Sequence, residues 1–563
     1  MRILFLCTRH NGLSQRAQVE LEELGHHLDI AEVSHGSQME AAAQRFRPEL
    51  IIAPMLKSAI PGSVWRKYTC LIVHPGIPGD RGPSALDWAL LEGEPSWGVT
   101  VLEAREEMDG GPIWAHQEFP LREASKSAIY RRETTDIAMR AIHEALERFQ
   151  AEHRPPFGAY IPAASGRERP PCRQADRQID WDASVERVLR HIRSADSAPG
   201  LQATLAGIKV RLYGAHPEGR LRGKPGELLA KRDDAVCVAC GDGALWISHL
   251  RRRQGLRPDD PRYDIKLPAT QVLADRLGDV PKRTLAPHAR PSVPTWQPIR
   301  YREQGHNGYL SFDLMNGAMS TVVLERMLAA YRHARARPTR TLVLCGGEDF
   351  WSNGIDLNAI EAAADPAQES WNNILAMNAL VREIVLTDDK RTVSLMRGNA
   401  GAGGVILALA ADRVYAREGI VLNPHYKGMG GLYGSEYWTY LLPKRVGDTA
   451  ARLLTESLQP LGTARAQRIG LLDGVVSGEG VFEALDAELA PGNEVRLWRK
   501  TLSDKAEHRR DDEQSKPLAR YAEEELAEMQ RNFFGPDPAY HLARRAFVRK
   551  QEVAVDGMAA ERA

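Results

Sequence analysis

A histidine, an irregular loop and a later aspartate form the first stretch of the chain that could transfer protons. His74 ends a short apolar run, 70–73, and the loop PGIPGDRGP follows it directly. A histidine at a strand end beside an irregular loop is a common position for chemistry in α/β proteins. Asp109 precedes two glycines, which can turn its carboxylate toward the same crevice. These residues indicate a histidine–carboxylate pair for proton transfer; the alternative is a turn histidine and an unrelated aspartate turn.

Glycine-rich loops in the second half of the chain could bind an oxyanion. Four glycines lie within 398–404, just before an apolar helical pattern, and a second loop, NGIDL, spans 353–357. Such loops let backbone N–H groups converge on a negatively charged oxygen. Tyr426 and Glu436 lie in and just after a third glycine-rich loop and could exchange a proton there. The alternative role of Glu436 is a charge that satisfies free N–H groups at a helix N-terminus.

Length, charge and cysteine content limit the class of protein. A chain of 563 residues exceeds a single core, so two to four domains are expected. The 74 basic residues balance the 74 acidic ones, and no apolar run approaches the roughly 20 residues that span a bilayer. We therefore expect neither a nucleic-acid nor a membrane partner. Six cysteines do not make a disulfide framework, which favours the cytoplasm, and Cys237 and Cys240 are expected to be packing residues.

The elements that must position His74 form a βαβαβ pattern. Three apolar runs have the length of buried parallel strands: 2–7, 28–33 and 50–54. Ligands of open parallel sheets bind beyond the carboxyl ends of the strands, so Arg9, Ser14 and Gln15 should line a crevice with His74. The absence of G-x-G-x-x-G after the first strand argues against a dinucleotide. A solvated loop position is the alternative for Arg9.

The middle of the chain alternates between regular and proline-rich segments. Residues 116–153 are expected to be helical, and Arg131 in this run either contacts an anionic ligand or lies on a solvated face. Polar, proline-rich linkers are expected around 155–174 and over 256–300. Between them, short alternating runs with Gly and Pro punctuation predict a small β-barrel, with strands at 208–212, 226–229, 235–239 and 244–249.

The second half begins a new α/β unit near residue 308. Its apolar runs predict strands at 309–312, 340–345, 393–396 and 414–415. A long amphipathic helix is predicted over 316–335. Beyond about Arg496 the chain is highly charged and helical. The whole is therefore predicted to be an α/β multidomain protein.

The first half resembles the folate-dependent formyltransferases. The matching residues are His74, Pro75, Pro78, Arg81, Gly82, Gly98, Val99, Thr100, Asp109, Gly110 and Gly111. The resemblance implies a Rossmann-like domain over 1–160 that binds 10-formyl-tetrahydrofolate, followed by an OB-like β-barrel over 175–255. It implies catalysis by His74 and Asp109. It places folate contacts at Arg9, Ser14, Gln15, Ile72 and Arg131. The family's catalytic asparagine falls on Ile72, which cannot donate a hydrogen bond to the formyl oxygen.

The second half resembles the crotonase family of enoyl-CoA hydratases and isomerases. The NGIDL loop, the glycine loop at 398–404 and the AADRV strand carry the likeness. It implies a crotonase-fold α/β spiral domain over 301–563, with a helical tail from about 496. It implies backbone oxyanion donors at Asn353 and Gly403, and coenzyme A contacts at Gly354, Ile355, Asp356, Leu357 and Gly404. The two hydratase glutamates fall on Ile406 and His425, so hydration is not expected. Tyr426 and Glu436 are the candidate replacement acids, and His425 is a third candidate.

The pairing of the two halves resembles hydrogenase-maturation proteins that supply carbon monoxide to the iron of nickel–iron hydrogenase. This implies formyl transfer from 10-formyl-tetrahydrofolate to coenzyme A and decarbonylation of the formyl-CoA that results. Small-molecule substrates and hydrogenase iron-centre assembly proteins would be the partners. Two alternatives remain: a formyltransferase that acts on an amine and uses the second half to bind coenzyme A, and a non-enzymatic assembly protein.

Overall fold

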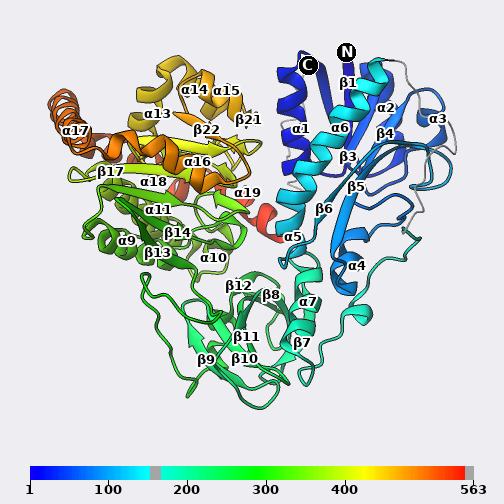
Figure 1. Ribbon diagram of the computed structural model, residues 1–563, viewed down its shortest axis with the longest axis horizontal. Coiled ribbons are helices and arrows are strands. Elements are labelled where there is room, and N and C mark those ends of the chain that lie inside the picture. The colour runs from blue at the N-terminus through cyan, green and yellow to red at the C-terminus, as the bar shows by residue number, and fades with distance from the viewer. Residues whose placement is uncertain (152–165, 552–563) are drawn as a thin grey trace. The chain divides into compact units, whose positions relative to one another are not determined.

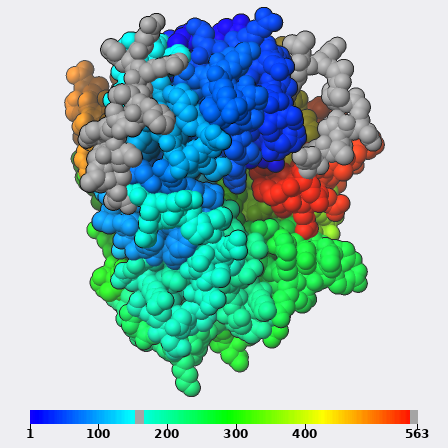
Figure 2. All heavy atoms as spheres, turned by 90° about the vertical axis from the view of Figure 1, so that its right-hand side faces the viewer, coloured from blue at the N-terminus to red at the C-terminus, as the bar shows by residue number. Residues whose placement is uncertain are grey.

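The computed structural model describes residues 1–151 and 166–551, which divide into two compact units (Figure 1). The first unit comprises 1–250, 273–282 and 293–296, and the second comprises 251–272, 283–292 and the chain from 297 onward. Figure 2 shows the N-terminal segment, in blue, as a continuous block of packed atoms. Each unit has its own cores.

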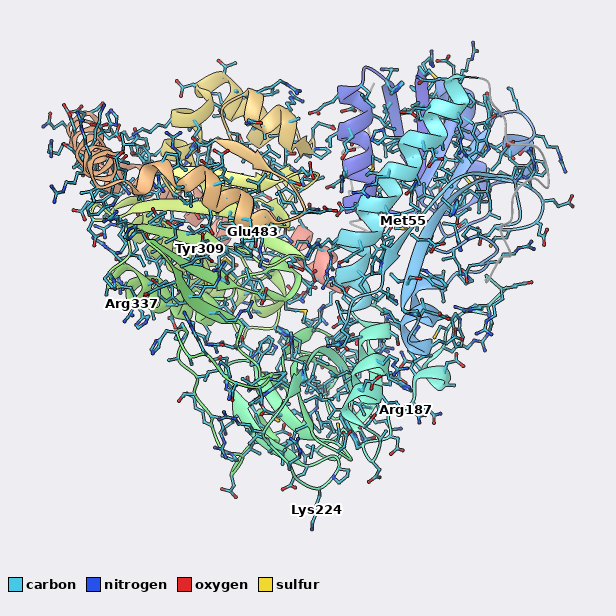
Figure 3. All side chains as sticks on the ribbon, viewed as in Figure 1. Met55, Arg187, Lys224, Tyr309, Arg337 and Glu483 are labelled. Carbon is cyan, nitrogen blue, oxygen red and sulfur yellow. The ribbon has the colours of Figure 1, made fainter. Side chains whose placement is uncertain are left out.

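The first unit opens with a six-stranded sheet in the order β2-β1-β3-β4-β5-β6. Its strands are β1 (Arg2–Cys7), β2 (His27–Glu32), β3 (Leu50–Met55), β4 (Cys70–His74), β5 (Ser96–Glu103) and β6 (Ile113–Pro120). The first four are parallel, and β5 and β6 are antiparallel. The carbonyl oxygen of Met55, labelled in Figure 3, accepts the Thr8 N–H at 2.8 Å, which joins the loop after β1 to the end of β3. The predicted βαβαβ start is confirmed.

Six α-helices of the described residues accompany this sheet, and the sequence prediction was wrong about where the run that leads into α6 becomes helical. The helices are α1 (Gly12–Glu23), α2 (Gly36–Phe46), α3 (Gly62–Trp65), α4 (Ala85–Glu92), α5 (Lys126–Ile129) and α6 (Thr135–Gln150). The expected helix over 116–153 begins only at Lys126, because 113–120 pairs with β5 as strand β6. A π-helical turn, Tyr130–Thr134, joins α5 to α6 and carries Arg131. Irregular turns of this kind often mark functional sites.

A second sheet in the first unit has the strand order β7-β8-β11-β10-β9. The strands are β7 (Leu201–Leu205), β8 (Ile208–Glu218), β9 (Leu228–Arg232), β10 (Ala235–Ala239) and β11 (Ala244–Arg252), and α7 (Val185–Ala195) packs beside them. Within the described residues this order is an open path, so the predicted small β-barrel is not confirmed. Cys237 and Cys240 are both buried, and Cys237 packs beside Trp246.

The predicted proline-rich connection, 256–300, carries structure of its own. It contains β12 (Lys266–Pro268), α8 (Ala269–Val272) and a 3₁₀ turn at Ala274–Arg276. In the first unit, Trp296 is buried in the core beside Trp246. In the second unit, Lys266 Nζ donates a hydrogen bond to Asn316 Oδ1 at 2.9 Å. This segment is therefore packed rather than a bare spacer. Residues 152–165 lie outside the described residues, and they include the first part of the earlier predicted linker, 155–165. The domain limits stay predictions.

The second unit is built on two sheets. The larger has the order β13-β14-β15-β17-β19-β22, and the smaller β16-β18-β20-β21. Their bounds are β13 (Ile299–Gln304), β14 (Asn307–Phe312), β15 (Thr341–Cys345), β16 (Phe350–Ser352), β17 (Arg391–Met396), β18 (Asn399–Gly401), β19 (Arg413–Arg417), β20 (Val421–Asn423), β21 (Leu461–Gly462) and β22 (Gly474–Val476). Tyr309 on β14, labelled in Figure 3, is fully buried and donates to Asp486. The four strands predicted here are confirmed.

Helices cover these sheets and form the predicted charged tail. They are α9 (Thr321–Arg335), α10 (Leu357–Glu361), α11 (Pro366–Val385), α12 (Gly403–Leu409), α13 (Trp438–Val446), α14 (Asp448–Glu456), α15 (Thr463–Arg468), α16 (Val481–Leu489), α17 (Val495–Ser515), α18 (Leu518–Phe534) and α19 (Ala539–Arg549). In the tail, α18 packs on α11 and α13, and α19 packs on α10. None of the helices in 1–151 or 166–551 is both long and apolar enough to cross a bilayer.

Candidate active sites

His74 lies at the carboxyl end of β4 between two carboxyl groups. Its Nε2 is 3.0 Å from Asp80 Oδ2, and its Nδ1 is 3.6 Å from Asp109 Oδ2. His74 is 5% exposed, and the Asp80 side chain is completely buried. A Cβ at Gly76 would lie 2.4 Å from His74 Nε2 and 2.7 Å from Asp80 Oδ2, so the close approach requires glycine. The structure brings the predicted pair together and adds Asp80, which sequence reasoning missed.

A left-handed backbone conformation and a hydrogen bond from the Gly82 N–H fix the position of Asp109. Its φ of 53° is left-handed, a conformation that aspartate tolerates better than most residues. Asp109 Oδ2 accepts the Gly82 N–H at 3.2 Å, which fixes the carboxylate on the His74 side. A Cβ at Gly111 would lie 1.8 Å from the Glu103 carbonyl oxygen, so the following turn also depends on glycine.

The predicted folate contacts differ in how accessible they are. Ser14 is completely buried and its hydroxyl donates to the Asn11 carbonyl oxygen at 2.9 Å within the first turn of α1. Its contact with a folate stays a prediction. Arg9 is highly exposed and lies 3.7 Å from Glu32, and Gln15 Nε2 donates to the His10 carbonyl oxygen at 3.4 Å. Ile72 lies within β4, half-buried in an apolar cluster.

Tyr426 and Glu436 form a buried hydrogen-bonded pair. The Tyr426 hydroxyl donates to Glu436 Oε2 at 2.7 Å, and Ser435 Oγ donates to Glu436 Oε1 at 2.9 Å. Burial raises the pKa of Glu436 above its ordinary value. Burial, together with the neighbouring Glu436 charge, raises the pKa of Tyr426 well above its ordinary value. A carboxylate with a raised pKa is a stronger base, so this pair can remove and return a proton out of contact with bulk water.

Two residues from distant parts of the chain hold Glu436 in place. Glu436 and Tyr437 have φ of 67° and 61°, which is unusual for consecutive residues that are not glycine. Asn378 Oδ1 accepts the Glu436 N–H at 2.8 Å, and the Glu525 carboxyl accepts the N–H groups of Tyr437 and Thr439, each at 2.8 Å. Glu525, rather than Glu436, therefore satisfies the N-terminus of α13. No local spacing connects Asn378 or Glu525 to the glycine loop, so the sequence could not reveal them.

Glu436 lies against the predicted oxyanion loop. A Cβ at Gly403 would be 2.7 Å from Glu436 Cδ, and a Cβ at Gly354 would be 3.3 Å from the Gly403 nitrogen. Gly403 is the first residue of α12, and its N–H has no acceptor among the described residues. The Asn353 N–H, in contrast, donates to the Gly317 carbonyl oxygen at 2.6 Å in this structure, and its role as an oxyanion donor stays a prediction. The turn at 315–317 uses that N–H.

The other predicted coenzyme A positions lead from this loop into α10. Asp356 Oδ1 accepts the Asn358 and Ala359 N–H groups, which caps the helix and occupies the side chain. Ile355 pairs with Met319, and Leu357 begins α10. A Cβ at Gly404 would lie 2.0 Å from the Ser352 carbonyl oxygen, so this position requires glycine. The Gly354 N–H donates to Ser352 Oγ at 3.0 Å and the Asp356 N–H donates to the Met319 carbonyl oxygen at 3.2 Å, so the backbone of this segment is tied into the fold. The coenzyme A contacts at 354–357 stay predictions.

Ile406 and His425 occupy the positions of the two hydratase glutamates, and neither is a carboxylic acid. Ile406 is completely buried in α12 and belongs to the core. His425 is half-buried, and burial lowers its pKa. Among the described residues, no three His, Cys, Asp or Glu side chains lie close enough to hold a metal ion. Of the three candidate acids, Glu436 is the one whose carboxyl lies against Gly403.

Glu525 should make the stability of the protein depend on pH. Burial raises its pKa to about 8 from an ordinary 4.5, so between these values the folded chain keeps a proton that the unfolded chain has lost. The free energy of unfolding should therefore fall by a few kcal/mol, in order of magnitude, as pH rises from about 4.5 to 8. Glu525→Gln should flatten this slope, as measured by urea unfolding. Glu524→Gln, at the exposed neighbour, should retain it, and an equal slope in both variants would contradict the prediction.

Comparisons with known proteins agree on both halves. Three family models match: "Formyl transferase" over 13–146, "Formyl transferase, C-terminal domain" over 171–258, and "Enoyl-CoA hydratase/isomerase" over 313–529. The chain is 48% identical to hydrogenase maturation factor HoxX of Bradyrhizobium diazoefficiens over 98% of this chain and 95% of that protein. HypX from Aquifex aeolicus in complex with tetrahydrofolic acid is 44% identical, with a TM-score of 0.92 over 98% of this chain and 96% of that one. A multiply substituted variant of that HypX has a TM-score of 0.93 at 43% identity and covers 98% of this chain and 99% of its own.

Proposed function

The chain belongs to the HypX/HoxX family of hydrogenase maturation factors, and from this premise we propose that it produces carbon monoxide from a formyl group. The formyl donor is 10-formyl-tetrahydrofolate and the carrier is coenzyme A. The protein acts in the cytoplasm and delivers its product to hydrogenase iron-centre assembly proteins. The observation that carries the proposal is the buried Tyr426–Glu436 pair beside Gly403, in a unit that lacks the hydratase glutamates.

The first step is formyl transfer at His74. The coenzyme A thiol loses its proton, its sulfur bonds to the formyl carbon, and the bond from that carbon to folate N10 breaks. N10 takes up the proton, which gives tetrahydrofolate and formyl-CoA. His74 and Asp109 are the groups that handle this proton. A thiolate attacks readily without help from an asparagine, which fits the presence of Ile72 at that position.

The second step is decarbonylation of formyl-CoA beside Gly403. The Gly403 N–H polarises the formyl oxygen, and Glu436 takes the proton from the formyl carbon. The carbon–sulfur bond then breaks, which releases carbon monoxide and the thiolate. Tyr426 shares the proton with Glu436, so the proton can return to sulfur and regenerate coenzyme A. The formyl group is thus divided into carbon monoxide and one proton, with no oxidant or reductant needed.

Labelled 10-formyl-tetrahydrofolate tests the proposal. The protein is incubated with a ¹³C-formyl donor, with and without coenzyme A, and headspace gas is trapped with reduced haemoglobin. Labelled carbon monoxide that depends on coenzyme A is the expected result. A labelled formamide without gas would favour an amine formyltransferase whose second unit only binds coenzyme A, and no consumption of the donor would favour a non-enzymatic assembly protein.

A further inference from the structure

We propose that Asp80 is the positioning residue that makes His74 a base toward a thiol acceptor. This inference rests on the proposed function and adds a residue to its first step. Asp80 lies in the loop after β4, six residues from His74, and none of its side chain is exposed. It contacts His74 from the side opposite Asp109, which leaves the two ring nitrogens in different surroundings.

The hydrogen bond to Asp80 determines which nitrogen of His74 carries the proton. We assign the proton to His74 Nε2, 3.0 Å from Asp80 Oδ2, because a carboxylate accepts hydrogen bonds. The lone pair of neutral His74 is then on Nδ1. Asp109 Oδ2 lies 3.6 Å from Nδ1, beyond hydrogen-bond distance, and the Asp109 side chain is 10% exposed. Nδ1 is therefore the nitrogen able to take a proton from a substrate.

Arg169 supplies the opposite charge behind Asp80. Its Nη1 is 3.9 Å from Asp80 Oδ1, its Nη2 pairs with Glu92 at 2.9 Å, and its guanidinium lies 5.5 Å from the centre of the Trp97 ring. Neither Asp80 Oδ1 nor Arg169 Nη1 has a hydrogen-bond partner among the described residues. The arginine thus compensates the buried charge, while the hydrogen bond of Asp80 is directed to His74.

The segment that carries Arg169 is fitted closely to the Asp80 loop. The Arg169 N–H donates to the Arg81 carbonyl oxygen at 3.0 Å, and the Cys172 N–H donates to Ser84 Oγ at 3.1 Å. A Cβ at Gly166 would lie 2.1 Å from the Asp80 nitrogen. The segment 166–172 thus packs closely against the backbone of the Asp80 loop. Residues 166–172 thus do more than link two domains.

The combination of Asp80 with Ile72 fits a thiol better than an amine. Ile72 removes the side-chain donor that would stabilise negative charge on the formyl oxygen. Asp80 stabilises the imidazolium that forms when His74 Nδ1 takes the thiol proton, as the buried aspartate of a catalytic triad does. His74 then returns that proton to folate N10 as the carbon–nitrogen bond breaks. The site is thus organised to activate the acceptor.

Asp80→Asn tests this role because it keeps the size of the side chain and removes its charge. With labelled 10-formyl-tetrahydrofolate and coenzyme A, we expect kcat for tetrahydrofolate release to fall by roughly 10²- to 10⁴-fold, with the KM for the folate unchanged. ¹⁵N-histidine spectra should show the Nε2–H tautomer of His74 in the wild-type protein and its loss in the variant. The matched control is Asp87→Asn, which removes another largely buried carboxylate, one that pairs with Lys126 and Arg177.

The outcomes separate this inference from the proposed function. Retention of both kcat and the His74 tautomer in Asp80→Asn would overturn the role of Asp80. An equal loss of kcat and of the tautomer in Asp87→Asn would overturn it as well. Failure of the wild-type protein to form a formyl thioester would instead overturn the proposed function. The tautomer is measured without an acceptor, so it decides whether Asp80 positions His74 in either case.

Discussion

Glu436→Gln should stop carbon monoxide release and cause formyl-CoA to accumulate. The amide keeps the shape of the side chain and can still accept the Tyr426 hydrogen bond, but it cannot take the proton from the formyl carbon. Loss of a positioned base typically costs about 10²- to 10⁴-fold in rate, so carbon monoxide formation should fall within that range. Rapid acid quench followed by chromatography measures the thioester, and haemoglobin trapping measures the gas.

A pair of tyrosine variants controls for disturbance of this loop. Tyr426→Phe removes the hydroxyl that bonds Glu436 and should slow the second step in the same way. Tyr437→Phe alters the neighbouring tyrosine, whose hydroxyl has no hydrogen bond among the described residues, and should leave carbon monoxide formation near the wild-type rate. Equal effects of the two variants would mean that packing, rather than proton transfer, explains the loss. Normal gas release by Glu436→Gln would refute the assignment of the base.

His74→Ala should abolish formyl transfer from the folate while leaving the second step intact. The ring is the group positioned between Asp80 and Asp109, and alanine offers no nitrogen to handle a proton. Tetrahydrofolate release should fall by at least about 10²-fold. The variant should still bind coenzyme A by calorimetry and should still produce carbon monoxide when chemically prepared formyl-CoA is supplied.

The design of the His74 experiment guards against misfolding. His143→Ala is a matched control, because His143 lies on α6 and pairs with Glu20 rather than with the Asp80 loop. It should transfer the formyl group normally. If His74→Ala also loses carbon monoxide formation from supplied formyl-CoA, the variant is misfolded, and its loss of formyl transfer does not test the role of His74. If it retains folate-dependent transfer, His74 is not the proton-handling group.

The strands that end at the first site could be predicted because buried parallel strands appear as continuous apolar runs. The run at 2–7 is such a case, and it forms β1 over those same residues. The helix prediction failed at 116–120, whose mixture of polar and apolar residues also fits a helix. Pairing with β5 makes it a strand, and pairing partners cannot be read from a local pattern.

The sequence by itself determined the two families, the pairing of their halves and the residue types available for chemistry. His74, Asp109, Tyr426 and Glu436 could be selected because each lies in or beside a glycine-rich turn with a recognisable order of residues. The tertiary structure decided which groups contact them. Glu525 lies 88 residues from Tyr437 along the chain, and Arg169 reaches Asp80 from a segment expected to be a linker. Hydrogen bonds and charge act over a few ångströms in space, so their partners emerge only when the chain has folded.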